Sequence, residues 1–131
     1  MQNTLPNSPY STYKQSSVET ATPDKLLLML FNGGIKFLHQ GQRALAEKDL
    51  AGANEYLGKV QDILTELMTT LDMEQGGEIA ANLYQLYDFY RRQTILANTK
   101  KDPALLDAVL EFFQTFKEIW AEAANKVRMG A

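Results

Sequence analysis

Apolar residues recur at a helical spacing over most of this chain, and this spacing is the feature that most constrains its fold. The pattern is clearest over residues 49–71, where apolar side chains cover an arc of roughly 140° on a helical wheel. Charged and polar residues fill the opposite side of that wheel. No strand-like alternation of apolar and polar residues competes with the helical pattern. The spacing therefore predicts an all-α protein.

Start and stop signals divide the helical pattern into four helices. Thr22-Pro23 and Asp102-Pro103 each combine an N-cap side chain with a proline at the first helical position, and Asp49 caps a third start. Gly76-Gly77 is expected to break the chain in a turn. Because the connections are short, neighbouring helices are predicted to be antiparallel, as in a four-helix bundle. The predicted helices run from Pro23 to about Ala46, from Asp49 to about Leu71, from about Glu78 to Asn98, and from Pro103 to about Lys126.

The chain is predicted to have one folded domain, since 131 residues suffice for a single core. Residues 1–21 are rich in Ser, Thr, Asn, Gln and Pro, so we expect a flexible N-terminal arm followed by a bundle over residues 22–131. A short extra helix that caps the bundle is an alternative for the arm. Tyr10 and Tyr13 lie in the arm and could anchor it to an apolar groove.

Composition excludes several classes of function. The chain has no cysteine, which excludes disulfides, zinc–thiolate sites and thiol nucleophiles. It has a single histidine, His39. The net charge of −3 gives no basic surface for nucleic acid. No apolar run is long enough to cross a membrane, and the N-terminus lacks a signal peptide. We expect no cofactor, no metal and no enzymatic activity, although a helical enzyme with a cleft that the sequence does not reveal remains an alternative.

Three of the four predicted helices hold more apolar residues than one inward stripe requires. Leu28 and Met29 extend the stripe of the first helix, whereas Tyr84, Phe89 and Leu96 flank the stripe of the third. Three interpretations stay open for this surplus. It is core in an asymmetric bundle, or a groove for an amphipathic partner helix, or the contact face of a homodimer.

Two glycines interrupt the apolar stripe of the first predicted helix. Gly34 and Gly41 lie seven residues apart and so share one face. Each costs about 1 kcal/mol of helix propensity relative to alanine. Close approach of a neighbouring helix backbone is the compensation that we expect at both positions.

Three strings in the chain resemble one known family. The first is SVETATPDKLLLMLFNGGIKFL, at residues 17–38. The second is LDMEQGGEIAANL at residues 71–83, followed by LYDFYRR at 86–92 and Ala97-Asn98. The third is Trp120-Ala121-Glu122 near the end of the last helix. In order and spacing they resemble the FliS family of flagellin-specific export chaperones over roughly residues 10–125.

The resemblance implies a cytoplasmic antiparallel bundle that binds the disordered C-terminal segment of flagellin. Such a chaperone prevents premature polymerisation and helps deliver flagellin to the flagellar type III export gate. Tyr13 matches the arm tyrosine implicated in the export-gate contact, and Tyr10 matches an adjacent aromatic position. We expect a monomer or weak homodimer, and a self-associating structural or regulatory module is the alternative. The predicted partner-binding residues are Tyr10, Tyr13, Leu28, Met29, Tyr84, Phe89 and Leu96.

Overall fold

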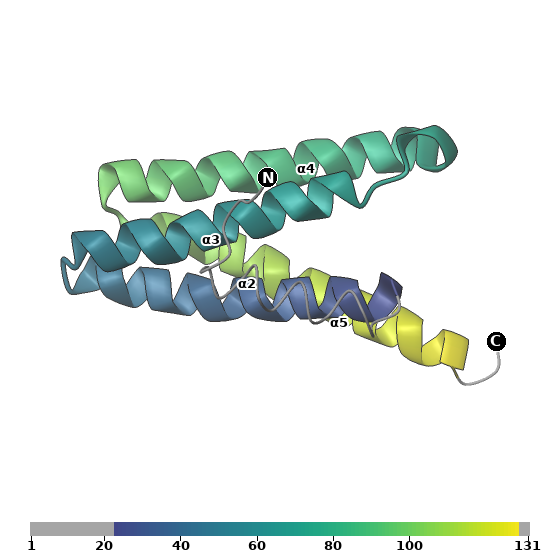
Figure 1. Cartoon of the computed structure of the whole chain (residues 1–131), viewed down its shortest axis with the longest axis horizontal. Coiled ribbons are helices and arrows are strands. Elements are labelled where there is room, and N and C mark those ends of the chain that lie inside the picture. The colour runs from purple at the N-terminus through teal and green to yellow at the C-terminus, as the bar shows by residue number, and fades with distance from the viewer. Residues whose placement is uncertain (1–22, 129–131) are drawn as a thin grey trace, which may run out of the picture.

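The structure is a computed structural model that describes residues 23–128. Four α-helices and a short 3-10 turn form its secondary structure, and no strand occurs within that range. The helices lie side by side along the long axis of the molecule and alternate in direction (Figure 1), which confirms the predicted all-α bundle. The elements are α2 (Pro23–Ala46), α3 (Leu50–Thr69), α4 (Met73–Lys100), η1 (Pro103–Leu106) and α5 (Asp107–Arg128).

Aspartate side chains cap three of the helix starts. Asp49, Asp72 and Asp102 each accept hydrogen bonds from backbone N–H groups two or three residues further on. These bonds satisfy N–H groups that the first helical turn leaves without a partner. The caps predicted at Asp49 and Asp102 are therefore confirmed, whereas Thr22 and its predicted cap lie outside the described residues.

Two helix boundaries differ from the predicted ones. α4 starts at Met73, ahead of the predicted Glu78, because Asp72 caps an additional turn there. The expected break is confined to Gly77, whose φ of 52° and ψ of −129° interrupt the helix. The last predicted helix begins as the 3-10 turn η1 and becomes α-helical only at Asp107. The Gly76-Gly77 signal thus marks a kink within an element rather than a connection between two.

Gly34 and Gly41 of α2 are sites of close packing. A Cβ atom at Gly34 would overlap the ring of Phe113, and one at Gly41 would overlap the side chain of Leu57. The close packing predicted at the two glycines is confirmed. The approaching group, however, is a side chain of α5 or α3 and not the helix backbone that we expected.

The packing of the helices leaves one end of the bundle open. α2 packs against α3 and α5, whereas α4 packs along α3 and touches α5 only slightly. α4 and α5 diverge towards the end of the bundle where α2 begins and α3 connects to α4 (Figure 1). Apolar side chains at this end are consequently only partly covered by neighbouring helices.

The surface of the bundle carries its histidine and an arginine pair of α4. His39 is exposed on the polar side of α2. Asp88 forms ion pairs with Arg91 at 2.6 Å and with Arg92 at 2.9 Å, so the paired basic residues belong to a charged cluster on α4.

None of the helices in residues 23–128 has the length and apolar composition that a bilayer crossing requires.

Candidate partner-binding site

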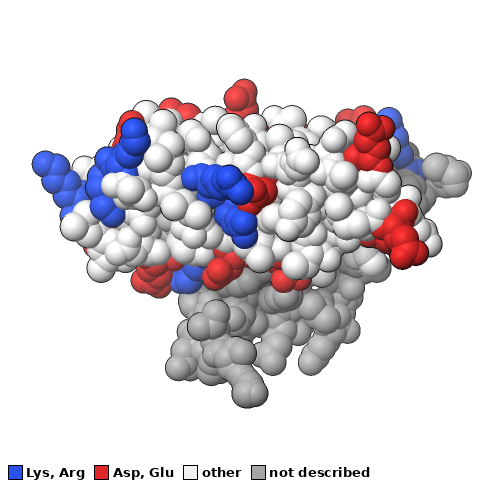
Figure 2. All heavy atoms as spheres, turned by 90° about the horizontal axis from the view of Figure 1, so that it is seen from above, with Lys and Arg blue, Asp and Glu red and all other residues white. Residues whose placement is uncertain are grey.

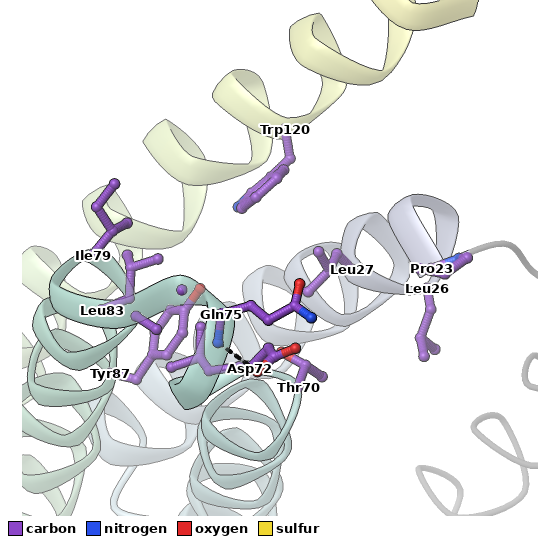
Figure 3. Close-up of a pocket in the computed structure, with 13 residues that line it drawn as sticks. Pro23, Leu26, Leu27, Thr70, Asp72, Gln75, Ile79, Leu83, Tyr87 and Trp120 are labelled. Carbon is purple, nitrogen blue, oxygen red and sulfur yellow. Dashed lines mark hydrogen bonds between the residues drawn. The ribbon is translucent and has the colours of Figure 1, made fainter.

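A cleft of about 450 Å³ opens where α4 and α5 diverge. The first turns of α2 form one wall, the α3–α4 connection and the start of α4 form a second, and Trp120 of α5 forms a third (Figure 3). Its lining is mostly apolar, which suits a non-polar side chain of a partner. The lining residues are Pro23, Leu26, Leu27, Thr70, Leu71, Asp72, Gln75, Gly76, Ile79, Ala80, Leu83, Tyr87 and Trp120.

Tyr87 lies at the base of the cleft and is almost fully buried. Burial raises the pKa of Tyr87 to about 12, because a phenolate loses its hydration in an apolar environment. The phenol therefore stays neutral at physiological pH, and the cleft keeps its apolar character.

Exposed apolar side chains are concentrated on α4. Phe89 has 56% of its surface exposed, Tyr84 43% and Leu96 39%. Six of the eight large hydrophobic residues that are exposed in the described part of the chain belong to this helix. They are Met73, Ile79, Tyr84, Phe89, Ile95 and Leu96, and the other two are Leu50 and Ile119.

The exposed residues of α4 form two flanks. Phe89 and Leu96 are seven residues apart and share one face. The ring of Phe89 packs on Tyr90 with 5.1 Å between centroids, and Tyr90 stacks on Phe112 at 4.4 Å, so this flank borders α5. Tyr84 and Ile95 lie on the opposite flank, which borders α3.

A charged ridge separates the two flanks. It consists of Asp88 and its two arginine partners, and Arg91 also donates a hydrogen bond to Thr65 of α3. Figure 2 looks onto this face of the molecule and shows a largely uncharged surface, with positive and negative atoms meeting near its centre. The ion pairs leave most of the face available for apolar contacts.

The structure brings only some of the predicted site residues together. Tyr84, Phe89 and Leu96 are exposed on α4, as a partner-binding role requires. Leu28 and Met29 are half-buried on α2 and line neither the cleft nor the flanks of α4. The two remaining predicted residues, Tyr10 and Tyr13, lie outside the described residues.

Sequence reasoning missed the cleft itself. Leu26, Leu83 and Trp120 lie on the apolar stripes of their helices, where the pattern indicates core. They do pack against the core, but only partly, since α4 and α5 separate at this end. Periodicity identifies the inward face of a helix, and it carries no information about where two helices diverge.

An antiparallel bundle with an open apolar cleft and exposed apolar flanks is typical of proteins that bind an amphipathic segment of another chain. A family profile described as "Flagellar protein FliS" matches residues 6–127. The chain belongs to the FliS family.

Curated relatives resemble the chain over most of its length. The protein of Vibrio cholerae is 43% identical over 112 residues, which cover 82% of each chain. The protein of Bacillus subtilis is 37% identical over 121 residues, which cover 92% of this chain and 90% of its own. The protein of Salmonella typhimurium is 34% identical over 113 residues, which cover 86% of this chain and 84% of the Salmonella protein. All three are named flagellar secretion chaperone FliS.

Proposed function

We propose that this protein is a flagellar export chaperone that binds the disordered C-terminal segment of flagellin. It holds the segment in the cytoplasm, prevents premature polymerisation, and aids delivery to the flagellar type III export gate. Membership of the FliS family and the names of the relatives support the chaperone role. The observation that carries the proposal is the set of exposed apolar residues on α4 beside an open apolar cleft.

Burial of apolar surface supplies the affinity in this proposal. The free segment exposes an apolar face through which it would associate with other flagellin molecules. On the chaperone, that face packs against Tyr84, Phe89 and Leu96 and sends a side chain into the cleft. Each square ångström of apolar surface that is buried contributes about 25 cal/mol, and ordering the segment opposes much of the gain. The net result is a complex stable enough to protect flagellin and weak enough to release it.

The remaining predicted residues have separate roles in the proposal. Tyr10 and Tyr13 of the N-terminal arm take part in the export-gate contact and in covering the free groove. Leu28 and Met29 extend the partner contact along α2. The chaperone works as a monomer or weak homodimer and needs no cofactor.

Calorimetric titration of the full chain with a peptide of the flagellin C-terminal segment tests the proposal. We expect a one-to-one complex in the micromolar range or tighter. A peptide of the same composition in scrambled order is the control, since it keeps the charge and removes the amphipathic pattern. Absence of binding at tens of micromolar would overturn the proposal.

Light scattering on the same samples separates the chaperone from a self-associating module. The proposal predicts that any dimer of the free protein gives way to a one-to-one complex when the peptide is added. A stable dimer that the peptide does not dissociate would favour the structural module instead.

A further inference from the structure

The indole nitrogen of Trp120 is buried and has no hydrogen-bond partner. A buried N–H group without an acceptor has lost its hydrogen bonds to water and has no replacement for them, which costs free energy. Such groups are rare in folded proteins. Trp120 lines the cleft, and in Figure 3 the nitrogen end of its ring points towards the middle of the surrounding side chains. The unsatisfied donor therefore lies at the candidate site.

Two polar side chains of the cleft, those of Thr70 and Asp72, already have hydrogen-bond partners within the protein. The hydroxyl of Thr70 donates a hydrogen bond to the carbonyl oxygen of Leu67 at 2.7 Å. The carboxylate of Asp72 accepts from the backbone N–H groups of Glu74 and Gln75 at 3.1 Å and 3.0 Å. No acceptor within the described residues pairs with the Trp120 N–H group, so a molecule that enters the cleft can supply one.

Charge at the edge of the cleft indicates the kind of occupant. Asp72, Glu74 and Glu78 are exposed at the start of α4, and residues 72–79 contain no basic residue. A second copy of this chain, with a net charge of −3, would bring like charges together here. A partner segment that carries a basic residue beside its apolar side chain complements this edge.

We propose that the indole N–H of Trp120 donates a hydrogen bond to a backbone carbonyl oxygen of the bound flagellin segment. The acceptor lies where an apolar side chain of the segment enters the cleft, and a basic residue of the segment faces the acidic edge. Carbonyl groups are free only in the last turn of a helix, or where the segment is not helical, and basic residues also favour a helix C-terminus. The cleft thus receives the C-terminal end of a partner helix. This inference rests on the proposed function.

The side-chain N–H resonance of Trp120 tests the inference directly. Trp120 is the only tryptophan in the chain, so the ¹⁵N-labelled full-length protein gives a single indole signal. Addition of the flagellin C-terminal peptide is expected to move the indole proton downfield and to slow its exchange with water. A purely structural role for Trp120 would leave both quantities unchanged.

An isosteric replacement isolates the hydrogen bond from the shape of the ring. Incorporation of 3-benzothienylalanine in a tryptophan auxotroph replaces only Trp120 and exchanges its N–H for sulfur. We expect about two- to tenfold weaker peptide binding, the usual effect of one hydrogen bond. The melting temperature should stay the same or rise, because the folded protein loses an unsatisfied donor. Trp120→Phe serves as a second variant and should bind no better than the isostere.

A double variant tests the role of the acidic edge formed by Asp72, Glu74 and Glu78. Glu74→Gln combined with Glu78→Gln is expected to weaken binding and to reduce its dependence on salt. An unchanged salt dependence would contradict the orientation assigned to the basic residue.

Two different failures are distinguishable. If the peptide binds the full chain but the indole signal does not move, and the isostere binds as tightly as the natural protein, the inference about Trp120 is wrong and the proposed function stands. If calorimetry shows no binding of the peptide to the natural protein, both are overturned.

Discussion

Phe113 of α5 occupies the space that a side chain at Gly34 of α2 would need. Both residues are buried, and Phe113 also packs edge-on against Phe31 with 5.7 Å between ring centroids. The contact fixes the distance between α2 and α5 near the middle of the bundle. α5 therefore packs along α2 while α4 packs along α3, and α4 and α5 diverge at the open end.

Gly34→Ala should destabilise the protein by about 1–3 kcal/mol, since the added methyl group forces the ring of Phe113 out of a packed core. Gly58→Ala is the matched control, because Gly58 lies within α3 and a Cβ there would meet nothing within 4 Å beyond the adjoining backbone of its own helix. The control should be stabilising by about 0.5–1 kcal/mol through helix propensity. Urea denaturation measures both, and equal effects would contradict the packing.

Gly77→Ala should also be destabilising, for a different reason. The methyl group would meet open space, but a φ of 52° with a ψ of −129° is a conformation that only glycine adopts readily. We expect a loss of about 1–3 kcal/mol in the free energy of unfolding. A gain like that of Gly58→Ala would show that the backbone at Gly77 is not held in this conformation.

Phe89→Glu and Leu96→Glu should weaken binding of the flagellin peptide about tenfold or more, because each places a charge in an apolar contact. Both side chains are more than one-third exposed, so the melting temperature should change by only a few degrees. Gln114→Glu, at an exposed position of α5 away from this flank, is the control and should bind almost normally. A collapse of stability in either apolar variant would identify that residue as core.

Tyr87 should make the protein sensitive to alkaline pH. Its pKa is about 12 in the folded state, above the ordinary value of 10.0, so the fold favours the neutral phenol. The stability that this provides is complete below pH 10 and is lost as the pH rises from 10 towards 12. Denaturation of the natural protein and of Tyr87→Phe at pH 9, 10 and 11 should give a stability difference that shifts steadily in favour of the variant. A constant difference would contradict burial of the phenol.

The helical elements could be predicted because their signals are local. Asp49 and Asp102 indicate helix starts because their carboxylates can cap free backbone N–H groups. The apolar stripe over residues 49–71 identifies the inward face of α3. Leu28 and Phe89 show where such reasoning stops. Both lie off the main stripe of their helices, yet the first is half-buried and the second largely exposed. Their exposure depends on what packs beside them, which is a property of the assembled bundle.

The cleft could not be predicted for the same reason. Ile79 has 73% of its surface exposed although it continues the inward stripe of α4. The divergence of α4 from α5 decides this exposure, and no residue near Ile79 in the sequence indicates it. Trp120 likewise belongs to the predicted stripe of the last helix, whereas its unpaired N–H becomes evident only when the neighbouring side chains are in place.

A crystal structure of the full chain bound to the flagellin C-terminal peptide tests the central claim most directly. The account predicts a peptide side chain in the cleft in contact with Leu83 and Trp120, and an apolar face of the peptide along α4 at Phe89. A peptide bound elsewhere on the bundle, with the cleft and the flanks of α4 uncovered, would contradict it.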